Sequence, residues 1–391
     1  AQELYDLLVT TRRERRLSAL KWLPWPSGSS LDGRSFCRML LWGTGGSQEV
    51  GHVAASAPAA APPSAAAQPL ESRPPPHLLC VARVQLPERG DFGDDEDFPE
   101  EELRVVQRIR HEGPVCGMAY NPADPSLIAT GTTSGDVLLF DLQEHARDSR
   151  ADPASGPCRP ATRLCSPSVP SAPCRSVAWG RHRPGHVLSG SARSDLCLWD
   201  VQRMRHSVQH DQPLQVITNA HGLRGAREVA FHPDLPSVIA SVGLDGRFCL
   251  WDARCAGGRP STEIQAHSGG AWSLIFAPPA LSETLVATGG QDGVARVWDL
   301  RQPHLSTCRF EGHARGCTVL SLDWIQDGGY LHFVSAGTDN RVFLWDPRHA
   351  SVAAGRAGHK PSRGDESSQR PLFRAVSGKC SKGSRTIWQV V

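Results

Sequence analysis

Four short strings of this 391-residue chain end in Trp-Asp, and their spacing constrains the fold more than any other feature. Their tryptophans are Trp199, Trp251, Trp298 and Trp345, and the interval is 47 residues from 251 to 298 and again from 298 to 345. A period of this length indicates one supersecondary unit per repeat. Because one unit cannot bury both of its faces, several must be arranged around a common axis, which makes a ring-shaped binding platform.

Each complete repeat carries three more polar residues at a constant distance before its tryptophan. An Asp precedes Trp by six residues, a Ser or Thr precedes it by ten, and a His precedes it by about thirty. A buried carboxylate is costly unless donors satisfy it, and imidazole and hydroxyl groups supply them. This pattern resembles the hydrogen-bonded tetrad of WD40 blades, so we assign these residues a structural role rather than metal binding or catalysis. The predicted tetrads are His221, Ser241, Asp245, Trp251; His267, Thr288, Asp292, Trp298; and His313, Ser335, Asp339, Trp345.

The remaining repeats are degenerate. The cycle from His111 has Ser134 at the Asp position, and the next cycle has Arg193 there and lacks the histidine. The last cycle, from His359, has Lys382 at that position. Six cycles are therefore countable from His111 to the end of the chain.

Two apolar segments upstream, Cys37–Thr44 and His77–Leu86, read as further strands. We expect them to complete a seventh blade by pairing with the end of the chain, since closure removes exposed sheet edges. Three tracts are predicted to be disordered because their composition buries little apolar surface, namely Ala54–Pro76, Ala146–Arg175 and Ala350–Arg370.

Composition excludes several classes of protein. No run reaches 18 apolar residues, so no membrane span is expected. The 12 cysteines contain no C-x-x-C pair, which argues against a zinc site or a disulfide framework. We expect Cys197 and Cys249 to be small buried hydrophobes in a reducing compartment. Neither a metal nor a cofactor is expected, and no enzymatic or sequence-specific DNA-binding motif is present. The absence of Met before Ala1 suggests a trimmed N-terminus.

Charge is clustered, although the formal net charge is only +2. Arg12, Arg13, Arg15 and Arg16 form a basic block that is either a nuclear or nucleic-acid signal or the solvated flank of a helix. An acidic block is either a solvated loop or a landing site for a basic partner. Its acids are Asp94, Asp95, Glu96, Asp97, Glu100, Glu101 and Glu102.

The N-terminal segment carries a helical pattern. Leu4, Leu7 and Leu8 have helical spacing, and neither Pro nor Gly interrupts Gln2–Leu20. This pattern predicts one amphipathic helix before the repeats. A helix outside a closed ring must dock on it, and its exposed face is then able to bind another helix.

This segment resembles the opening of the retinoblastoma-binding, MSI-type family of histone-binding WD40 proteins. The resemblance continues in the same order through nearly the whole chain. The matching strings are Leu4–Leu7, Glu14, Lys21–Pro24, Val84–Pro87, His111–Gly113, Ile128–Thr130, Asp136–Leu138, Leu250–Arg254, Ala287–Gly289, Val297–Arg301 and Gly337–Asp339.

The resemblance implies an all-β fold, a seven-bladed WD40 β-propeller with an N-terminal α-helix. Residues 1–24 would hold the helix and the strand after it. Residues 25–110 would hold the first-blade strands, the Ala/Pro tract and the acidic loop, and residues 111–391 the repeats.

The implied function is that of a non-enzymatic, nuclear or nuclear and cytoplasmic scaffold subunit of chromatin complexes. Its partners would be histones 3 and 4 and other subunits of these complexes. The helix of histone 4 would bind Leu4, Leu7, Leu8, Thr11 and Arg15, with the acidic block as an accessory surface.

The chain departs from this family at the ring's rim and in a late loop. Pro114, Arg227 and Thr318 occupy positions where the family tends to have glutamate, and Pro347–Gly358 lacks the family's acidic stretch.

A second hypothesis is a substrate receptor of a cullin ubiquitin ligase. Trp251–Arg254, Trp298–Arg301 and Trp345–Arg348 each read Trp-Asp-x-Arg, which resembles the adaptor-docking box of such receptors.

Overall fold

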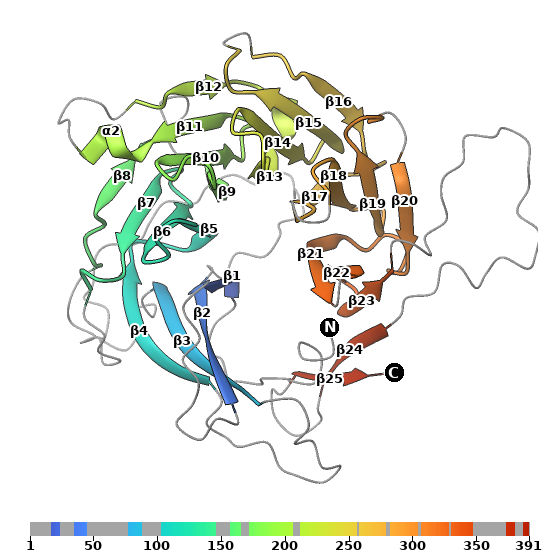
Figure 1. The fold of residues 1–391 in the computed structure, drawn as a ribbon, viewed down its shortest axis with the longest axis horizontal. Helices are drawn as coiled ribbons and strands as arrows, with labels where there is room; N and C mark the ends of the chain where they lie inside the picture. Colours follow the sequence, from blue (N-terminus) through green and yellow to red (C-terminus); the bar gives the residue numbers. More distant parts are fainter. Residues whose placement is uncertain are drawn as a thin grey trace, which may run out of the picture.

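The structure is a computed structural model, and it is almost entirely β. It describes residues 17–23, 35–44, 77–87, 103–145, 157–165, 172–205, 212–255, 258–278, 282–303, 306–327, 330–346, 373–379 and 386–390. In these residues six antiparallel sheets surround a common axis (Figure 1). The predicted fold class, an all-β WD40-type propeller, is therefore confirmed.

Four strands that follow one another in the chain make up each of the first five sheets. The first sheet contains β1 (Leu17–Leu23), β2 (Ser35–Thr44), β3 (His77–Pro87) and β4 (Leu103–His111). The second contains β5 (Val115–Tyr120), β6 (Leu127–Thr132), β7 (Val137–Asp141) and β8 (Thr162–Leu164). The third contains β9 (Cys174–Trp179), β10 (His186–Ser191), β11 (Leu196–Asp200) and β12 (Gln215–Ile217), with helix α2 (Val201–Arg205) after β11.

The remaining sheets contain the three complete repeats. The fourth sheet begins after a short 3-10 helix, η2 (Gly222–Arg224), and contains β13 (Ala226–Phe231), β14 (Val238–Gly243), β15 (Arg247–Asp252) and β16 (Thr262–Gln265). The fifth contains β17 (Ala271–Phe276), β18 (Leu285–Gly290), β19 (Val294–Asp299) and β20 (Ser306–Glu311). The sixth has five strands, β21 (Val319–Asp327), β22 (Tyr330–Gly337), β23 (Arg341–Trp345), β24 (Phe373–Lys379) and β25 (Thr386–Val390).

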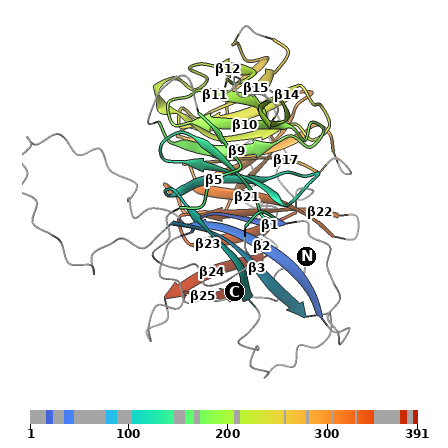
Figure 2. The ribbon, with the colours of Figure 1, turned by 90° about the vertical axis from the view of Figure 1, so that its left-hand side faces the viewer.

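The first strand of every sheet lies nearest the axis (Figure 1). Consecutive innermost strands contact one another from β1 through β21. The strands run across the thickness of the ring, so their ends lie on two opposite faces (Figure 2). We call one of these the turn face. It carries the start of each innermost strand and, in the second to sixth sheets, the turn between the second and third strands.

Tight turns on the turn face need a left-handed backbone at one position in each of five sheets. Gly135, Gly246 and Gly293 occupy it with φ of 99°, 81° and 74°, whereas Ser194 and Asn340 have φ of 74° and 58°. Glycine adopts this conformation without a steric penalty, which explains its presence in three of the five turns.

The described residues form six sheets rather than the seven that were predicted. Strands β2 and β3 do not pair with the end of the chain but with each other, and β1 and β4 complete their sheet. The end of the chain instead extends the sixth sheet, where β24 pairs with β23 and β25 pairs with β24. The physical reason is that, among the described residues, the N-terminal part supplies four strands that pair with one another, whereas the last cycle supplies two.

Two further predictions were wrong in part. Leu17–Leu20, predicted to end the N-terminal helix, lie in β1 because pairing with β2 outweighs local helical spacing. The tract Ala146–Arg175, predicted to be disordered, contains β8 and the start of β9, and β8 is hydrogen-bonded to β7. Residues 1–16 lie outside the described residues, and so do Ala54–Pro76 and Ala350–Arg370.

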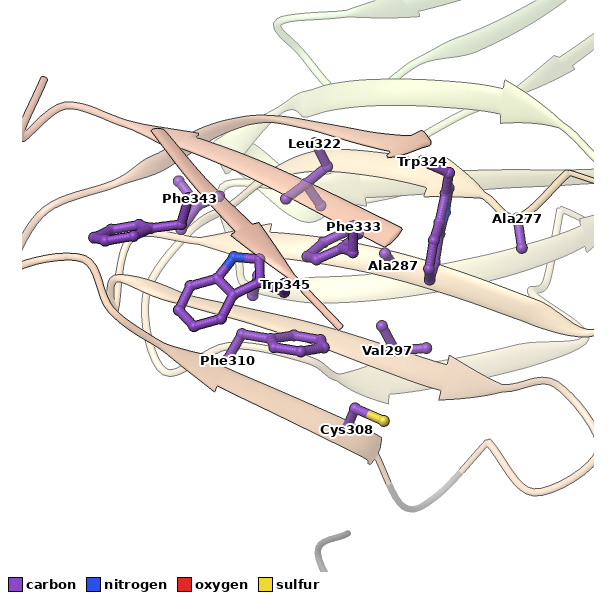
Figure 3. Packing of buried hydrophobic residues seen from close by; sticks show 12 residues of the cluster. Ala277, Ala287, Val297, Cys308, Phe310, Leu322, Trp324, Phe333, Phe343 and Trp345 are labelled. Carbon is purple, nitrogen blue, oxygen red and sulfur yellow. The ribbon is translucent and has the colours of Figure 1, made fainter. Parts of the chain in front are cut away.

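The core consists of apolar clusters between neighbouring sheets. The cluster between the fifth and sixth sheets is aromatic (Figure 3). Phe333 is fully buried there, with ring centroids 5.0 Å from Trp324 and 5.2 Å from Phe310. Phe310 in turn lies 5.3 Å from Trp345, the tryptophan of a repeat string. Trp199, Trp251 and Trp298 are likewise buried in apolar clusters.

We expect Phe333→Ala to lower the free energy of unfolding by about 3–5 kcal/mol, because a large buried side chain leaves a cavity between two sheets. Urea unfolding measures the loss. The control is Leu223→Ala, at a fully exposed leucine, with an expected change below about 0.5 kcal/mol. Equal effects of the two substitutions would contradict the described packing.

Candidate functional site

Three tetrads join the turn face to the sheets beneath it. In each, a buried imidazole lies between a hydroxyl and a carboxylate, and the tryptophan Nε1 donates to that hydroxyl oxygen. Nε2 lies 2.8 Å from the Ser241 hydroxyl in His221 and 2.9 Å from the Thr288 and Ser335 hydroxyls in His267 and His313. Nδ1 lies 3.0 Å from Asp245, 3.0 Å from Asp292 and 2.9 Å from Asp339. The indole bonds from Trp251, Trp298 and Trp345 are 2.8, 2.9 and 2.9 Å long.

In the tetrads of His221 and His313 the network assigns one direction to every proton. A carboxylate only accepts, so Nδ1 donates to Asp, and the hydroxyl that receives the indole N–H donates to Nε2. At His267, Nη1 of Arg296 also lies 2.5 Å from Nδ1. Burial lowers the pKa of His267 and of His313, which favours the neutral imidazole. Although burial raises the pKa of Asp292, the bond from His267 and the charge of Arg296 hold it well below its usual range. The tetrads are therefore saturated structural units, with no base or ligand left for chemistry.

A glycine in each complete repeat makes room for the imidazole, and it was missed at the sequence level. A Cβ on Gly290 would lie 2.1 Å from Nδ1 of His267. Cβ atoms on Gly243 and Gly337 would approach His221 and His313 to 2.4 and 2.5 Å. All three glycines precede their Trp by eight residues, so the repeat alignment contains this signal.

The degenerate repeats replace the missing bonds with others. Nδ1 of His111 donates to the carbonyl of Gly113, 2.6 Å away, and Nε2 lies 2.9 Å from Thr130. In the next sheet the side chain of Arg193 is exposed, and Trp199 still donates to Ser189 at 2.9 Å. These blades keep the hydroxyl-centred half of the tetrad without its carboxylate.

A β-bulge recurs at the second residue of all six innermost strands. At this position the register skips one residue relative to the neighbouring strand, in β1, β5, β9, β13, β17 and β21. A bulge leaves the extra residue unpaired and redirects its side chain. We call the bulge residues of the last five of these strands the bulge ring: Cys116, Arg175, Arg227, Trp272 and Leu320.

Four members of the bulge ring interact across neighbouring blades. The Arg227 guanidinium lies over the indole of Trp272, with Cζ 4.4 Å from the ring centroid. Burial and the charge of Arg175 both lower the pKa of Arg227. Burial raises the pKa of the Cys116 thiol, while Arg175 and Arg227 act against it. Two cations, an indole and a thiol therefore share one rim.

Below this rim, a second charged layer lies nearer the middle of the innermost strands. Oε2 of Glu228 accepts from the backbone N–H of Leu274 at 2.7 Å, which ties β13 to β17. Burial raises the pKa of Glu228 and of Asp323, and the charge of Lys21 opposes both shifts. The side chain of Asp323 is exposed, but neighbouring protein removes part of the water around its carboxyl group, and this raises its pKa. The charge of Lys21 on β1 therefore acts on a carboxyl group of β13 and on one of β21.

The opposite face carries two of the three Trp-Asp-x-Arg strings. Arg254 and Arg301 pair with the aspartates of their own strings at 2.6 and 2.5 Å, and their side chains are 73% and 74% exposed. These bonds lower the pKa of Asp252 and of Asp299 to about 2. Arg348, in the third string, lies outside the described residues.

The other predicted site residues lie in parts of the chain that the structure does not describe. These are Leu4, Leu7, Leu8, Thr11 and Arg15, and all seven acids of Asp94–Glu102. Cys197 and Cys249 are buried as predicted, and burial raises the pKa of Cys249 to about 12.

No group of His, Cys, Asp and Glu side chains in the described residues is arranged to hold a metal ion. Among the same residues, no helix has the length and apolar character of a membrane span.

We expect Asp292→Ala to lower the melting temperature clearly more than Asp124→Ala. The first change leaves His267 and Arg296 without their acceptor in a buried setting, at about 1–3 kcal/mol for each unpaired group. Asp124 is exposed, and its carboxylate accepts hydrogen bonds from the backbone N–H and the hydroxyl of Ser126. A thermal-shift assay compares the two variants, and equal shifts would show that the tetrad does not stabilise its blade.

Comparison with known families agrees with this geometry. The profile of the WD domain, G-beta repeat, matches residues 212–252, 258–299 and 305–346. Each of these stretches contains one complete tetrad and ends at the aspartate that follows the tetrad tryptophan. Proteins with such repeats bind partner proteins and are typically non-enzymatic scaffolds. The chain therefore carries three WD40 repeats in a β-propeller that is suited to binding partner proteins.

Proposed function

We propose that this protein is a non-enzymatic scaffold subunit of chromatin assembly, modifying or remodelling complexes, and that it holds histones 3 and 4. The observation that carries the proposal is the resemblance of Leu4–Pro24 to the N-terminal segment of histone-binding WD40 proteins. Generic WD40 repeats account for the ring but not for this segment. A nuclear location follows from the proposal and agrees with the basic block Arg12–Arg16.

The described fold supports an interaction role for the N-terminal segment. Leu17 begins an innermost strand at the turn face, so the preceding residues leave the fold beside a surface made of turns and bulges. An amphipathic helix attached there has one face for the ring and one for a partner helix. We assign the histone-four helix to Leu4, Leu7, Leu8, Thr11 and Arg15.

The charge distribution decides where histones would not bind. Histone tails are rich in Lys and Arg, and the bulge ring presents Arg175 and Arg227. Like charges brought together at an interface cost several kcal/mol. We therefore assign the basic histone surfaces to the acidic block Asp94–Glu102, which lies between β3 and β4, and not to the bulge ring.

We expect the full-length chain to retain the purified histone three–four pair at moderate ionic strength. A Leu7→Glu/Leu8→Glu variant should bind at least tenfold more weakly, because burial of each leucine contributes about 1.5–3 kcal/mol. A pull-down followed by titration measures both. Arg259→Gln, at an exposed arginine on the opposite face, is the matched control. Failure of the folded wild-type chain to bind above background would remove the proposal.

A second candidate, a substrate receptor of a cullin ubiquitin ligase, is favoured by the opposite face. Arg254 and Arg301 have the same geometry, since each lies in an Asp-anchored, exposed position at the end of a third strand. The pairing with Asp orients the guanidinium and leaves most of it in water. Such repeated cationic positions are suited to docking an adaptor.

If this candidate holds, the ligase adaptor should co-purify with the chain and should be lost on Arg301→Ala. Arg259→Ala removes an exposed arginine of the same face that has no ion pair among the described residues, and it should retain the adaptor. Co-purification that is unchanged by Arg301→Ala, or no co-purification, would contradict it.

A further inference from the structure

We propose that the bulge ring is a binding site for an acidic segment of a partner protein, in which Arg175 and Arg227 receive a carboxylate and Trp272, Leu320 and Leu223 contact apolar side chains beside it. The proposal is independent of histone binding, because it concerns different residues and a ligand of opposite charge.

The geometry holds the two arginines ready for an anion. Both extend from bulges at the turn-face ends of the neighbouring strands β9 and β13, and both side chains are partly exposed. The Trp272 indole lies against the Arg227 guanidinium, with Cζ 4.4 Å from the ring centroid, and this contact restricts the side chain. The N–H groups of a guanidinium lie in its plane and are suited to pairing with a carboxylate. A guanidinium oriented in this way matches a carboxylate with little loss of side-chain freedom.

No described acid neutralises the two arginines by direct contact. The carboxylate of Glu228, the nearest acid in the chain to Arg227, accepts from the backbone of Leu274. Burial raises the pKa of Glu228, which weakens it as a counter-ion. The two cations also repel one another, since Arg175 lowers the pKa of Arg227. An anionic ligand offsets both this repulsion and the cost of burying the charge of Arg227.

The rest of the turn face carries surplus positive charge. Its described acids are already held by nearby donors. Glu112 and Asp136 pair with Arg163, Asp195 accepts from Asn219, and Asp245, Asp292 and Asp339 belong to tetrads. The exposed arginines Arg193, Arg224 and Arg315 lie in turns or connections on this face, and none makes an ion pair with a described acid. A field of this sign attracts acidic partners and repels basic ones.

Apolar side chains around the cations favour a peptide over a nucleic acid. Leu223 is fully exposed in the connection before β13, and Leu320 of the bulge ring is 44% exposed. Trp272, which lies between these two leucines in the sequence, adds an indole. Phosphate-backbone binding relies on basic and polar contacts, whereas a protein segment supplies both carboxylates and apolar groups. The ligand class is therefore an acidic segment that contains hydrophobic residues.

A random library of 12-residue peptides, panned against the full-length chain, tests this inference without a known partner. We expect the enriched peptides to be net acidic and to contain apolar residues. Fluorescence anisotropy then gives the affinity of the best binder for the wild type, Arg175→Gln, Arg227→Gln and the control Arg259→Gln. Each bulge-ring substitution should weaken binding at least tenfold, and the control should change it less than twofold. Melting temperatures establish that the variants are folded, and Arg175→Gln leaves the Arg227–Trp272 contact in place.

Several results would overturn the inference. Enriched peptides that are neutral or basic would do so, as would the failure of panning to enrich any sequence. If Arg259→Gln weakened peptide binding equally, the effect would come from the net charge of the protein and not from the bulge ring. Tighter binding of a single-stranded oligonucleotide than of the best peptide, lost in the same two variants, would assign the surface to nucleic acid instead. A phosphoserine version that binds where the Asp/Glu version does not would exclude a carboxylate as the ligand.

Discussion

The buried imidazole that bridges a hydroxyl and a carboxylate is the interaction on which the three complete blades depend. His221, His267 and His313 each join the connection before an innermost strand to the tight turn of the same sheet and to its tryptophan. Every polar atom in this network has a partner, so burial does not leave an unpaired group. A glycine opposite each ring keeps the space that the imidazole needs. The network therefore holds the ends of strands in place where the turn face is built.

The same interaction determines the charge of the turn face. Three of its aspartates are held inside tetrads, and Glu112 and Asp136 are held by Arg163. The arginines of the bulge ring have no comparable partner among the described residues. Stability and recognition are thus separated on one surface, because the acids stabilise the blades and the cations remain available for binding. This separation is why a chain with a formal net charge of only +2 has a locally basic rim.

Much of the fold could be predicted from residue spacing, and specific elements show why the rest could not. The four residues of a tetrad belong to one blade, so they lie within about thirty residues of one another. The same spacing recurs in each complete repeat, and the sequence therefore shows it as a constant pattern. Leu17–Leu20 was misread as helix because leucine spacing reports local preference, whereas β2 provides the pairing that makes β1 a strand. The seventh blade was expected from a count of cycles. In the part of the last cycle that the structure describes there are two strands, β24 and β25, and they add to an existing sheet edge.

The repeat of Trp-Asp strings was enough to establish blades, their tetrads and a ring, because each of these follows from interactions inside one repeat or between identical neighbours. The bulge ring became visible only in the folded chain. Its members come from five different strands and include two arginines, a tryptophan, a cysteine and a leucine, so no residue type marks them. They lie at one level because the bulges occur at the same register in each sheet. Proximity across blades depends on how the sheets are arranged around the axis. The spacing of residues along the sequence carries no information about that arrangement.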